Sequence, residues 1–362
     1  MKELNIGIIG AGYIGREHAR SLRLVANQFG GRVKLLGISD RNLETAQRVA
    51  DEYSISFATT NNEEVINHPE INVIFSCVPT KFHIDVVEQA TTQGKAIFLE
   101  KPFATSVKQA REIHKLLTQS SAAHQVGFVL RYAPTYTALK KILKQQEQVS
   151  PLRHVSLRDD QNFPISGMHH FTSWRSDAEQ AGAGVLIEHG IHDVDLFEHL
   201  FGKVKRVSAT QRNFHEYKGI EDFIEIRMEF ESGVTASMLH IWHEIPAHTS
   251  VRSFEIFYNK SMVTLQDYAM HHISVRDQEA DKTYTRNDLF SMLEDDPMYK
   301  DIAHREDLLF VSDYYAIQDY WFLRNLLEGD KPSPTIDDGL RAFEIAHACY
   351  DSARNDGAWV DV

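Results

Sequence analysis

The chain has 362 residues, of which 43% are hydrophobic and 25% charged; it is too long for one ordinary core and too apolar for a disordered chain, so we expect two folded domains. A formal net charge of −13 disfavours binding to nucleic acid and to anionic membranes, and neither is an expected partner. The two cysteines, Cys77 and Cys349, are too few for a disulfide framework and fit a reducing compartment. Strand-like sequence begins at Leu4 and no apolar run could cross a bilayer, so we expect a cytoplasmic protein without a signal peptide.

Short apolar runs alternate with helical patterns through the first third of the chain. We expect strands buried on both faces at 4–9, 33–39, 73–77, 96–99 and 125–129, and helices at 13–28, 42–53, 82–93 and 106–119. Strand–helix alternation of this kind predicts a parallel, doubly wound sheet. Residues 1–130 are therefore interpreted as an α/β dinucleotide-binding domain.

The pattern changes after a helix expected at 133–148, where Ser150 and Pro151 interrupt it. A strand at 152–158, a loop at 159–182 and a helix at 185–201 come next, and then strands follow one another directly. In one of them Ile224, Ile226 and Met228 alternate with charged residues, which indicates one buried and one exposed face. We expect a mostly antiparallel, open-faced sheet in an α+β domain over 131–362. Helices at 308–327 and 338–354 close the chain, and the second could pack back on the first domain.

A glycine-rich turn lies between the first strand and the first helix. Its sequence is G-x-G-x-x-G, with Gly10, Gly12 and Gly15 at the three glycines. Gly10 allows a tight turn, Gly12 leaves room for a pyrophosphate, and Gly15 lets the helix pack close to the strand. The free N–H groups of the helix N-terminus, which begins at Tyr13 and Ile14, can then bind phosphate oxygens.

The second strand ends in Ser39, Asp40 and Arg41. A carboxylate there can accept hydrogen bonds from the adenosine ribose hydroxyls and repels a 2′-phosphate, which favours NAD. Arg41 could instead pair with the phosphate of NADP, so NADP stays possible. Asp40 could alternatively cap the helix that follows.

Four further segments extend the pattern beyond a dinucleotide fold. They are Pro79-Thr80-Lys81-Phe82-His83, Glu100-Lys101-Pro102, the crossover from Val126 to Pro134 with Arg131, and Trp174-Arg175 followed by Gly182-Ala183-Gly184 and Glu188-His189-Gly190-Ile191-His192-Asp193-Val194-Asp195. In this order, and with the N-terminal glycines, they resemble the glucose-fructose oxidoreductase / inositol dehydrogenase / MocA family.

The resemblance implies a six-stranded Rossmann domain, an open antiparallel sheet that often forms an oligomer interface, and redox chemistry on sugars or polyols. It implies that Pro79, Thr80, His83, Glu100, Lys101, Trp174 and Arg175 border the cofactor and that Lys101, Arg131, Glu188 and His192 contact the substrate. Two positions depart from the family pattern. Ala183 replaces a glycine, and Glu188 stands where polyol dehydrogenases commonly have Asp, which makes an inositol-like substrate doubtful.

Oxidation of an alcohol needs a base for the hydroxyl proton and positive charge near the developing alkoxide. His192 is the candidate base and Lys101 the candidate electrostatic group. Glu188 lies one helical turn before His192 and could orient it or bind a substrate hydroxyl; Asp195 could instead fix the tautomer of His192. Each role has an alternative. His192 could be a buried structural histidine and Lys101 a surface lysine. His83 could pack at a helix end, and Trp174 and Arg175 could pack in a loop.

Nineteen histidines raise the question of a metal site. His240 and His243 should project from opposite faces of a strand, which argues against joint ligation, and no zinc signature is present. We therefore expect no catalytic metal. Candidate ligands also include His169, His170, His248, His271 and His272.

A dehydrogenase or reductase acting on a sugar-like alcohol or ketone is the leading interpretation. A non-catalytic dinucleotide sensor and a redox-neutral, NAD-using hydrolase are the alternatives. In the strand at 234–242, Met238, His240 and Trp242 share one face while Leu239 and Ile241 share the other. Because both sheet faces carry large side chains, we expect a homodimer or homotetramer that packs through this sheet.

Overall fold

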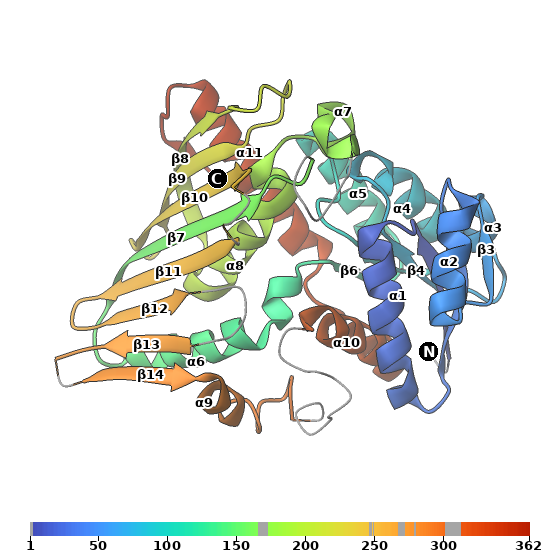
Figure 1. The fold of residues 1–362 in the computed structure, drawn as a ribbon, viewed down its shortest axis with the longest axis horizontal. Coiled ribbons are helices and arrows are strands. Elements are labelled where there is room, and N and C mark those ends of the chain that lie inside the picture. Colours follow the sequence, from blue (N-terminus) through green and yellow to red (C-terminus); the bar gives the residue numbers. More distant parts are fainter. Residues whose placement is uncertain are drawn as a thin grey trace. The chain divides into compact units, whose positions relative to one another are not determined.

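The computed structural model describes residues 3–165, 173–245, 248, 250–266, 272–278, 280–300 and 313–362. The chain divides into two compact units (Figure 1). Unit 1 comprises residues 1–129, 179–182 and 315–343, and unit 2 comprises residues 130–178, 183–314 and 344–362. Within the described residues, no helix is both long and apolar enough to cross a membrane.

Unit 1 is built on a six-stranded parallel sheet with the strand order β3-β2-β1-β4-β5-β6. This order is that of a doubly wound dinucleotide-binding fold and confirms the predicted fold class. The strands are β1 (Leu4–Ile9), β2 (Val33–Ser39), β3 (Phe57–Thr59), β4 (Val73–Ser76), β5 (Ala96–Leu99) and β6 (His124–Val126). β1, β4 and β5 are almost wholly buried because helices cover both sheet faces.

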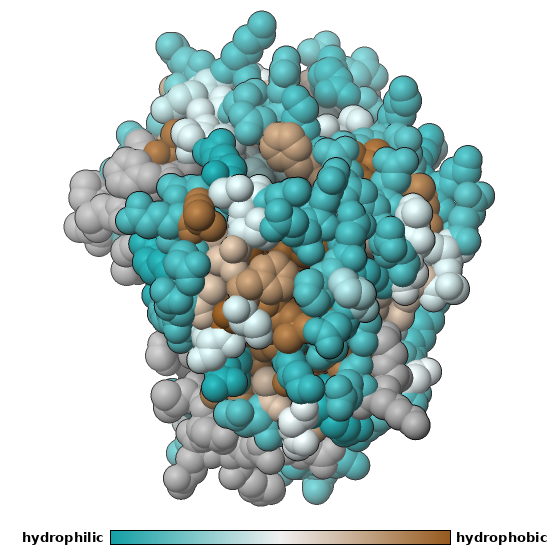
Figure 2. Space-filling view, turned by 90° about the vertical axis from the view of Figure 1, so that its right-hand side faces the viewer, coloured by the Kyte–Doolittle hydropathy of each residue, from teal (hydrophilic) through white to brown (hydrophobic). Residues whose placement is uncertain are grey.

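The helices of unit 1 connect these strands in sequence. They are α1 (Tyr13–Ala26), α2 (Leu43–Tyr53), α3 (Asn62–Ile66), α4 (His83–Thr92) and α5 (Val107–Gln119). In Figure 2, which views the side of Figure 1 where α2, α3 and β3 lie, hydrophilic side chains cover most of the surface around a smaller apolar patch.

A late segment of the chain also belongs to unit 1, which differs from the predicted division at residue 130. Helix α10 (Tyr314–Glu328) packs on the sheet, where the Phe322 ring lies 5.6 Å from Phe75 and 5.4 Å from Phe98. The first half of α11 (Ile336–Arg354) follows it, and residues 344–354 of that helix belong to unit 2. The predicted start of the α10 helix at 308–312 lies outside the described residues.

Unit 2 contains a nine-stranded sheet with the order β14-β13-β12-β11-β7-β10-β9-β8-β15. Every pairing is antiparallel except that of β7 with β10, so the predicted mostly antiparallel sheet is confirmed. The strands are β7 (Leu152–Asn162), β8 (Val204–Arg212), β9 (Phe223–Phe230), β10 (Thr235–His243), β11 (Val251–Tyr258), β12 (Met262–Gln266), β13 (His272–Arg276), β14 (Asp281–Thr285) and β15 (Val360–Asp361).

Helices cover one face of this sheet. Those of unit 2 include α6 (Pro134–Glu147), α8 (Ile191–Phe201) and the short α9 (Arg286–Ser291). Tyr136 of α6 and Phe197 of α8 both contact Phe254 of β11, with ring centroids 5.8 and 5.9 Å apart. Along β10 the exposure alternates as predicted: Met238, His240 and Trp242 are buried, and Leu239 and Ile241 are partly exposed.

Local differences from the predicted elements have simple causes. β3 and α3 are three and five residues long and too short to show a periodic pattern. β7 continues to Asn162 because its parallel pairing with β10 extends through His243. The helix predicted at 185–201 begins as a π-helix over Leu186–Gly190 before α8, and a short helix, α7 (Ala178–Ala181), precedes it.

Candidate active site

The glycine turn of unit 1 has the geometry that its sequence predicts. Gly10 has a φ of +98°, and a Cβ there would lie 2.5 Å from the carbonyl oxygen of Cys77. A Cβ on Gly15 would lie 1.9 Å from the carbonyl oxygen of Gly10. Gly12, in contrast, has nothing within 4 Å of an added Cβ, so the turn opens on free space where a pyrophosphate fits. The N-cap residue of α1 is Gly12, which has no side chain to cap the helix that begins at Tyr13 and Ile14.

Asp40 lies beside this turn. Its carboxylate accepts the backbone N–H of Ala11 at 2.9 Å and that of Asn42 at 3.0 Å. Asn42, not Asp40, caps α2, because its side-chain oxygen accepts the N–H groups of Glu44 and Thr45. The capping alternative for Asp40 is therefore wrong. Arg41 is exposed.

The turn after β4 holds Pro79, Thr80 and His83. Pro79 precedes the short 3-10 helix Thr80–Phe82, and Thr80 is buried. The His83 imidazole is also buried, where its Nδ1 lies 2.8 Å from the Ser76 hydroxyl. Burial lowers the pKa of His83 to about 3, so it is neutral. We assign His83 to packing beneath the end of β4, the alternative to its predicted contact with the cofactor.

The Glu-Lys-Pro segment follows β5 directly. The Glu100 carboxylate points inward and is 4% exposed, and its contact with the cofactor stays a prediction. One of its oxygens accepts the backbone N–H of Lys101 at 3.1 Å, and the other lies 3.1 Å from His18 Nε2. Lys101 is partly exposed at the carboxyl end of a parallel strand, where ligands bind in such sheets.

In unit 2, a buried carboxylate accepts hydrogen bonds from the backbone at the start of the helical segment that leads to His192. Glu221 accepts the backbone N–H groups of Gly184 at 2.7 Å and Leu186 at 3.0 Å, and also the Tyr350 hydroxyl at 2.8 Å. A Cβ on Gly184 would lie 1.9 Å from the Glu221 carbonyl oxygen. Gly184 therefore has to be glycine for this close approach, whereas Ala183 is tolerated. No pattern in the sequence indicated this role of Glu221.

Glu188 lies within the π-helix and is 4% exposed. Its carboxylate accepts the Arg175 Nε–H at 2.8 Å, and the Arg175 guanidinium lies 4.6 Å above the Trp174 ring. The structure thus joins Trp174, Arg175 and Glu188, three residues that the sequence predicted separately. His192 follows in α8 and is 7% exposed.

Asp195 and Arg131 form a tight pair. Two guanidinium nitrogens of Arg131 donate to the two carboxylate oxygens of Asp195, at 2.8 and 2.6 Å. This bidentate pairing holds the Arg131 guanidinium against Asp195, and the contact of Arg131 with the substrate stays a prediction. Each oxygen of Asp195 accepts one of these hydrogen bonds, and its part in fixing the tautomer of His192 stays an alternative.

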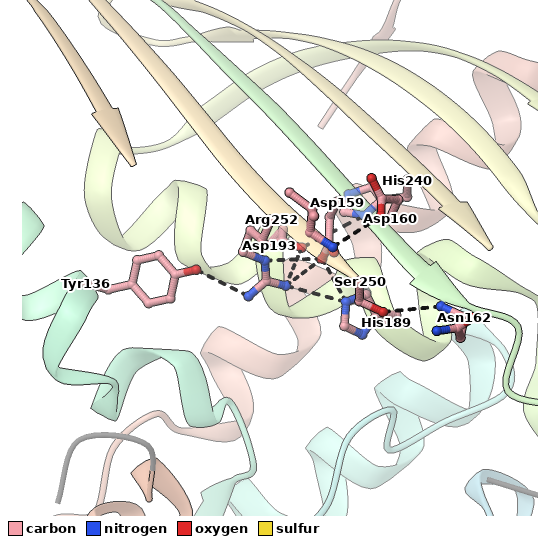
Figure 3. Close-up of polar contacts among 10 residues, drawn as sticks. Tyr136, Asp159, Asp160, Asn162, His189, Asp193, His240, Ser250 and Arg252 are labelled. Atoms are coloured by element: carbon pink, nitrogen blue, oxygen red, sulfur yellow. Dashed lines mark hydrogen bonds and ion pairs between the residues drawn. The ribbon is translucent and has the colours of Figure 1, made fainter. Parts of the chain in front are cut away.

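A buried polar network supports the His192 helix from the sheet side (Figure 3). Arg252 of β11 is 2% exposed; its Nη2 lies 2.7 Å from Asp159 Oδ2 and 3.0 Å from Asp193 Oδ2. His189 Nε2 lies 2.7 Å from the same oxygen of Asp159, and the Tyr136 hydroxyl accepts from Arg252. Asp193 directly follows His192, so the network fixes the backbone at the candidate base.

The two carboxylates of this network share one guanidinium. Burial opposes ionisation of Asp159, but Arg252 and His189 outweigh it and lower the pKa of Asp159 well below its usual value. Burial raises the pKa of Asp193, and the negative charge of Asp159 adds to that shift. Arg252 and His189 therefore favour the ionised form of Asp159, whereas burial and the charge of Asp159 favour the neutral form of Asp193. Nothing in the sequence pattern singled out Arg252.

Two groups of described residues have spacing that could hold a metal ion, namely Asp159, Asp193 and His240, and Asp160, His243 and His248. His240 and His243 fall in different groups, as expected for opposite sheet faces. In the first group the guanidinium of Arg252 already supplies the cation. In the second, His243 Nδ1 accepts the Ile245 N–H at 3.2 Å, which puts the proton of the neutral ring on Nε2, the atom nearest Asp160. We assign a metal to neither group. His169, His170 and His271 lie outside the described residues.

Comparison with known families identifies both halves of the chain. Residues 4–128 match the oxidoreductase family model with an NAD-binding Rossmann fold, and residues 136–264 match the GFO/IDH/MocA C-terminal domain. The chain belongs to the GFO/IDH/MocA oxidoreductase family, which confirms the resemblance seen in its motifs and the dinucleotide class of its cofactor.

Individual relatives add detail. Levoglucosan dehydrogenase from Pseudarthrobacter phenanthrenivorans is 23% identical, over 100% of this chain and 99% of that protein. The scyllo-inositol 2-dehydrogenase (NAD(+)) of Bacillus subtilis is 27% identical, over 65% of this chain and 66% of that protein. The matched segment spans less than two thirds of several curated relatives, among them inositol 2-dehydrogenase from Rhizobium meliloti at 57%. A solved structure of levoglucosan dehydrogenase with NADH and levoglucosan shares the fold, with a TM-score of 0.83 at 20% identity and 99% coverage of both chains.

Proposed function

We propose that the protein is an NAD-dependent dehydrogenase that moves a hydride between the nicotinamide and a CH–OH group of a sugar, polyol or sugar derivative. One observation carries this proposal. The open glycine turn at Gly12 and the Glu-Lys-Pro segment follow the carboxyl ends of parallel strands of the same sheet. Relatives with the same motifs are named as levoglucosan and inositol dehydrogenases.

Residues of unit 1 would hold the cofactor. The turn at Gly10, Gly12 and Gly15 and the uncapped start of α1 bind the pyrophosphate, while Asp40 accepts the ribose hydroxyls with lone pairs that its backbone contacts leave over. The bound nicotinamide accepts or supplies the hydride. Pro79 and Thr80 border it in the turn after β4.

Three residues would act on the substrate. Lys101 donates a hydrogen bond to the reacting oxygen and stabilises its negative charge. His192 accepts the hydroxyl proton during oxidation and returns it during reduction. Glu188 binds a neighbouring hydroxyl, and its ion pair with Arg175 holds the carboxylate in place.

The open face of the unit 2 sheet supports a proposal on assembly. We infer a homodimer or a dimer of dimers packed through this face, because apolar side chains such as Leu239 and Ile241 lie on it beside charged ones. Light scattering should give at least twice the 41.4 kDa mass of one chain; a mass of one chain contradicts the proposal. We place the protein in the cytoplasm, in keeping with its two free, buried cysteines.

The function is tested by a panel of polyols, aldoses, anhydro sugars and sugar acids, offered with NAD and with NADP. Reduction of NAD by at least one panel member, followed by the absorbance of reduced nicotinamide, supports the proposal. Cofactor binding without reduction by any of them contradicts it and favours a dinucleotide sensor. Release of product without net change in cofactor favours a redox-neutral hydrolase.

A further inference from the structure

Three ionisable side chains meet beneath the Glu-Lys-Pro segment of unit 1. His18 of α1 lies between Asp319 of α10 and Glu100. Its Nδ1 is 3.0 Å from each carboxylate oxygen of Asp319, and its Nε2 is 3.1 Å from Glu100 Oε1. His18 and Asp319 are fully buried and Glu100 is 4% exposed. We call these three residues the His18 triad.

The contacts define the protonation state of His18. Because each ring nitrogen faces a carboxylate, both nitrogens must carry a proton to donate. Burial disfavours the imidazolium, but Asp319 and Glu100 outweigh burial and raise the pKa of His18 to about 10. His18 is therefore positively charged at neutral pH and donates to both carboxylates at once.

Neighbouring residues pack closely around the three side chains of the His18 triad. The His18 ring lies 5.2 Å from Phe75 and 4.9 Å from Phe98, ring centre to ring centre. The Ser21 hydroxyl donates to Asp319. A Cβ on Gly127 would come within 2.5 Å of Glu100 Oε1, so this glycine reserves the space that the carboxylate fills.

The His18 triad is hydrogen-bonded to the backbone of Lys101 through Glu100. The second oxygen of Glu100 accepts the Lys101 N–H at 3.1 Å, so any shift of the carboxylate moves the Lys101 peptide. We propose that His18 and Asp319 are positioning residues for Lys101, acting by fixing the Glu100 carboxylate that holds its backbone. The inference rests on the proposed function, which assigns Lys101 to the reacting oxygen.

Stability alone does not account for such a triad. Removing three ionisable groups from water is costly, and apolar residues of similar volume often replace buried ion pairs without loss of stability. A geometric task at Lys101 does account for it, since a displacement of about 1 Å at a reacting group can lower a rate about a hundredfold.

A double-mutant cycle tests the proposal: His18→Gln, Lys101→Ala and the double variant, each measured for kcat, for the dissociation constant of NADH and for Tm. We expect His18→Gln to lower kcat at least tenfold in the wild-type background and less than threefold in the Lys101→Ala background, because without the lysine its position no longer matters. The NADH constant should change less than threefold, since the glycine turn is intact.

Phe322→Leu is the matched control, because Phe322 lies on the same helix as Asp319 and packs on the same rings without a polar link to Glu100. It should lower Tm and leave kcat within about twofold. If His18→Gln does not fold, Asp319→Asn, which keeps the side-chain shape, takes its place in the cycle.

The outcomes separate the two claims. If the effects of His18→Gln and Lys101→Ala multiply, or if His18→Gln and Asp319→Asn keep full kcat, the positioning role is overturned while the proposed function stands. If Lys101→Ala itself keeps wild-type turnover, the role of Lys101 in the proposed function fails first.

Discussion

The carboxylate of Asp40 accepts the backbone N–H of Ala11 at 2.9 Å, which joins the end of β2 to the glycine turn. The carboxylate is thereby held beside the glycine turn, where we propose that it accepts the adenosine ribose hydroxyls. Its negative charge opposes a 2′-phosphate, and the neighbouring Arg41 is exposed.

We therefore predict a preference for NAD over NADP of at least tenfold in kcat/KM on a single substrate. Asp40→Ser should reduce the preference by weakening NAD and relieving the repulsion of NADP. Arg41→Ala serves as the control, and it should leave the NAD value unchanged. A tenfold preference of the wild-type enzyme for NADP would show that Arg41 decides the cofactor.

Lys101→Ala and His192→Asn should each lower kcat about a hundredfold or more, because one removes charge stabilisation and the other removes the base. NADH affinity should change little in His192→Asn, because that residue belongs to unit 2, whereas the glycine turn belongs to unit 1. Lys108→Ala, an exposed lysine of α5, and His199→Asn, on the same helix as His192, are matched controls. Near-wild-type turnover in Lys101→Ala or His192→Asn would remove that residue from the mechanism.

Stability should fall on both sides of neutral pH. Burial lowers the pKa values of His83 and His240 to about 3 and that of His347 to about 4. Below about pH 6.5 these histidines therefore bind protons in the unfolded chain but not in the folded chain, which destabilises the fold. The pKa of His18 is raised to about 10, so its stabilising contribution is complete below about pH 6.5 and is lost as pH rises towards 10.

Calorimetric Tm values from pH 5 to pH 10 check this prediction. Each proton that only the unfolded chain binds lowers the free energy of unfolding by about 1.4 kcal/mol per pH unit. The decline of Tm below pH 6.5 should therefore be steep. The alkaline decline should be weaker in His18→Gln. A constant Tm between pH 7 and pH 5 would mean that these histidines are not buried in the neutral form.

Chelation should leave activity unchanged. Arg252 supplies the cation in one candidate metal group, and the other would need the Nε2 lone pair of His243, which the contact at Nδ1 disfavours. Turnover after exhaustive EDTA treatment should match that of the untreated enzyme. Loss of turnover that zinc or manganese restores would reassign the histidines.

The sequence was sufficient to predict those parts of the fold that depend on residues close together in the chain. Alternation of buried strands and helices predicted the sheet of unit 1. The glycine spacing predicted the turn, because a Cβ on Gly10 or Gly15 would collide with backbone atoms. The alternation of Met238, His240 and Trp242 likewise predicted the faces of β10.

Long-range partners could not be predicted. His18 and Asp319 are 301 residues apart, and Glu221 reaches backbone N–H groups that come 35 and 37 positions earlier. No periodicity links such residues. The sequence shows the charges of Arg131 and Glu100, but only the fold shows that Asp195 and His18 pair with them.

Direct transfer of hydride from a substrate carbon to NAD is the central claim. The most direct test uses a sugar or polyol that reduces NAD, deuterated at its carbon-bound positions, in ordinary water with stoichiometric enzyme. We predict that one deuterium per turnover appears in the reduced nicotinamide, with a matching carbonyl in the product. Reduced cofactor without deuterium, or a product formed with no reduced cofactor at all, would contradict the account.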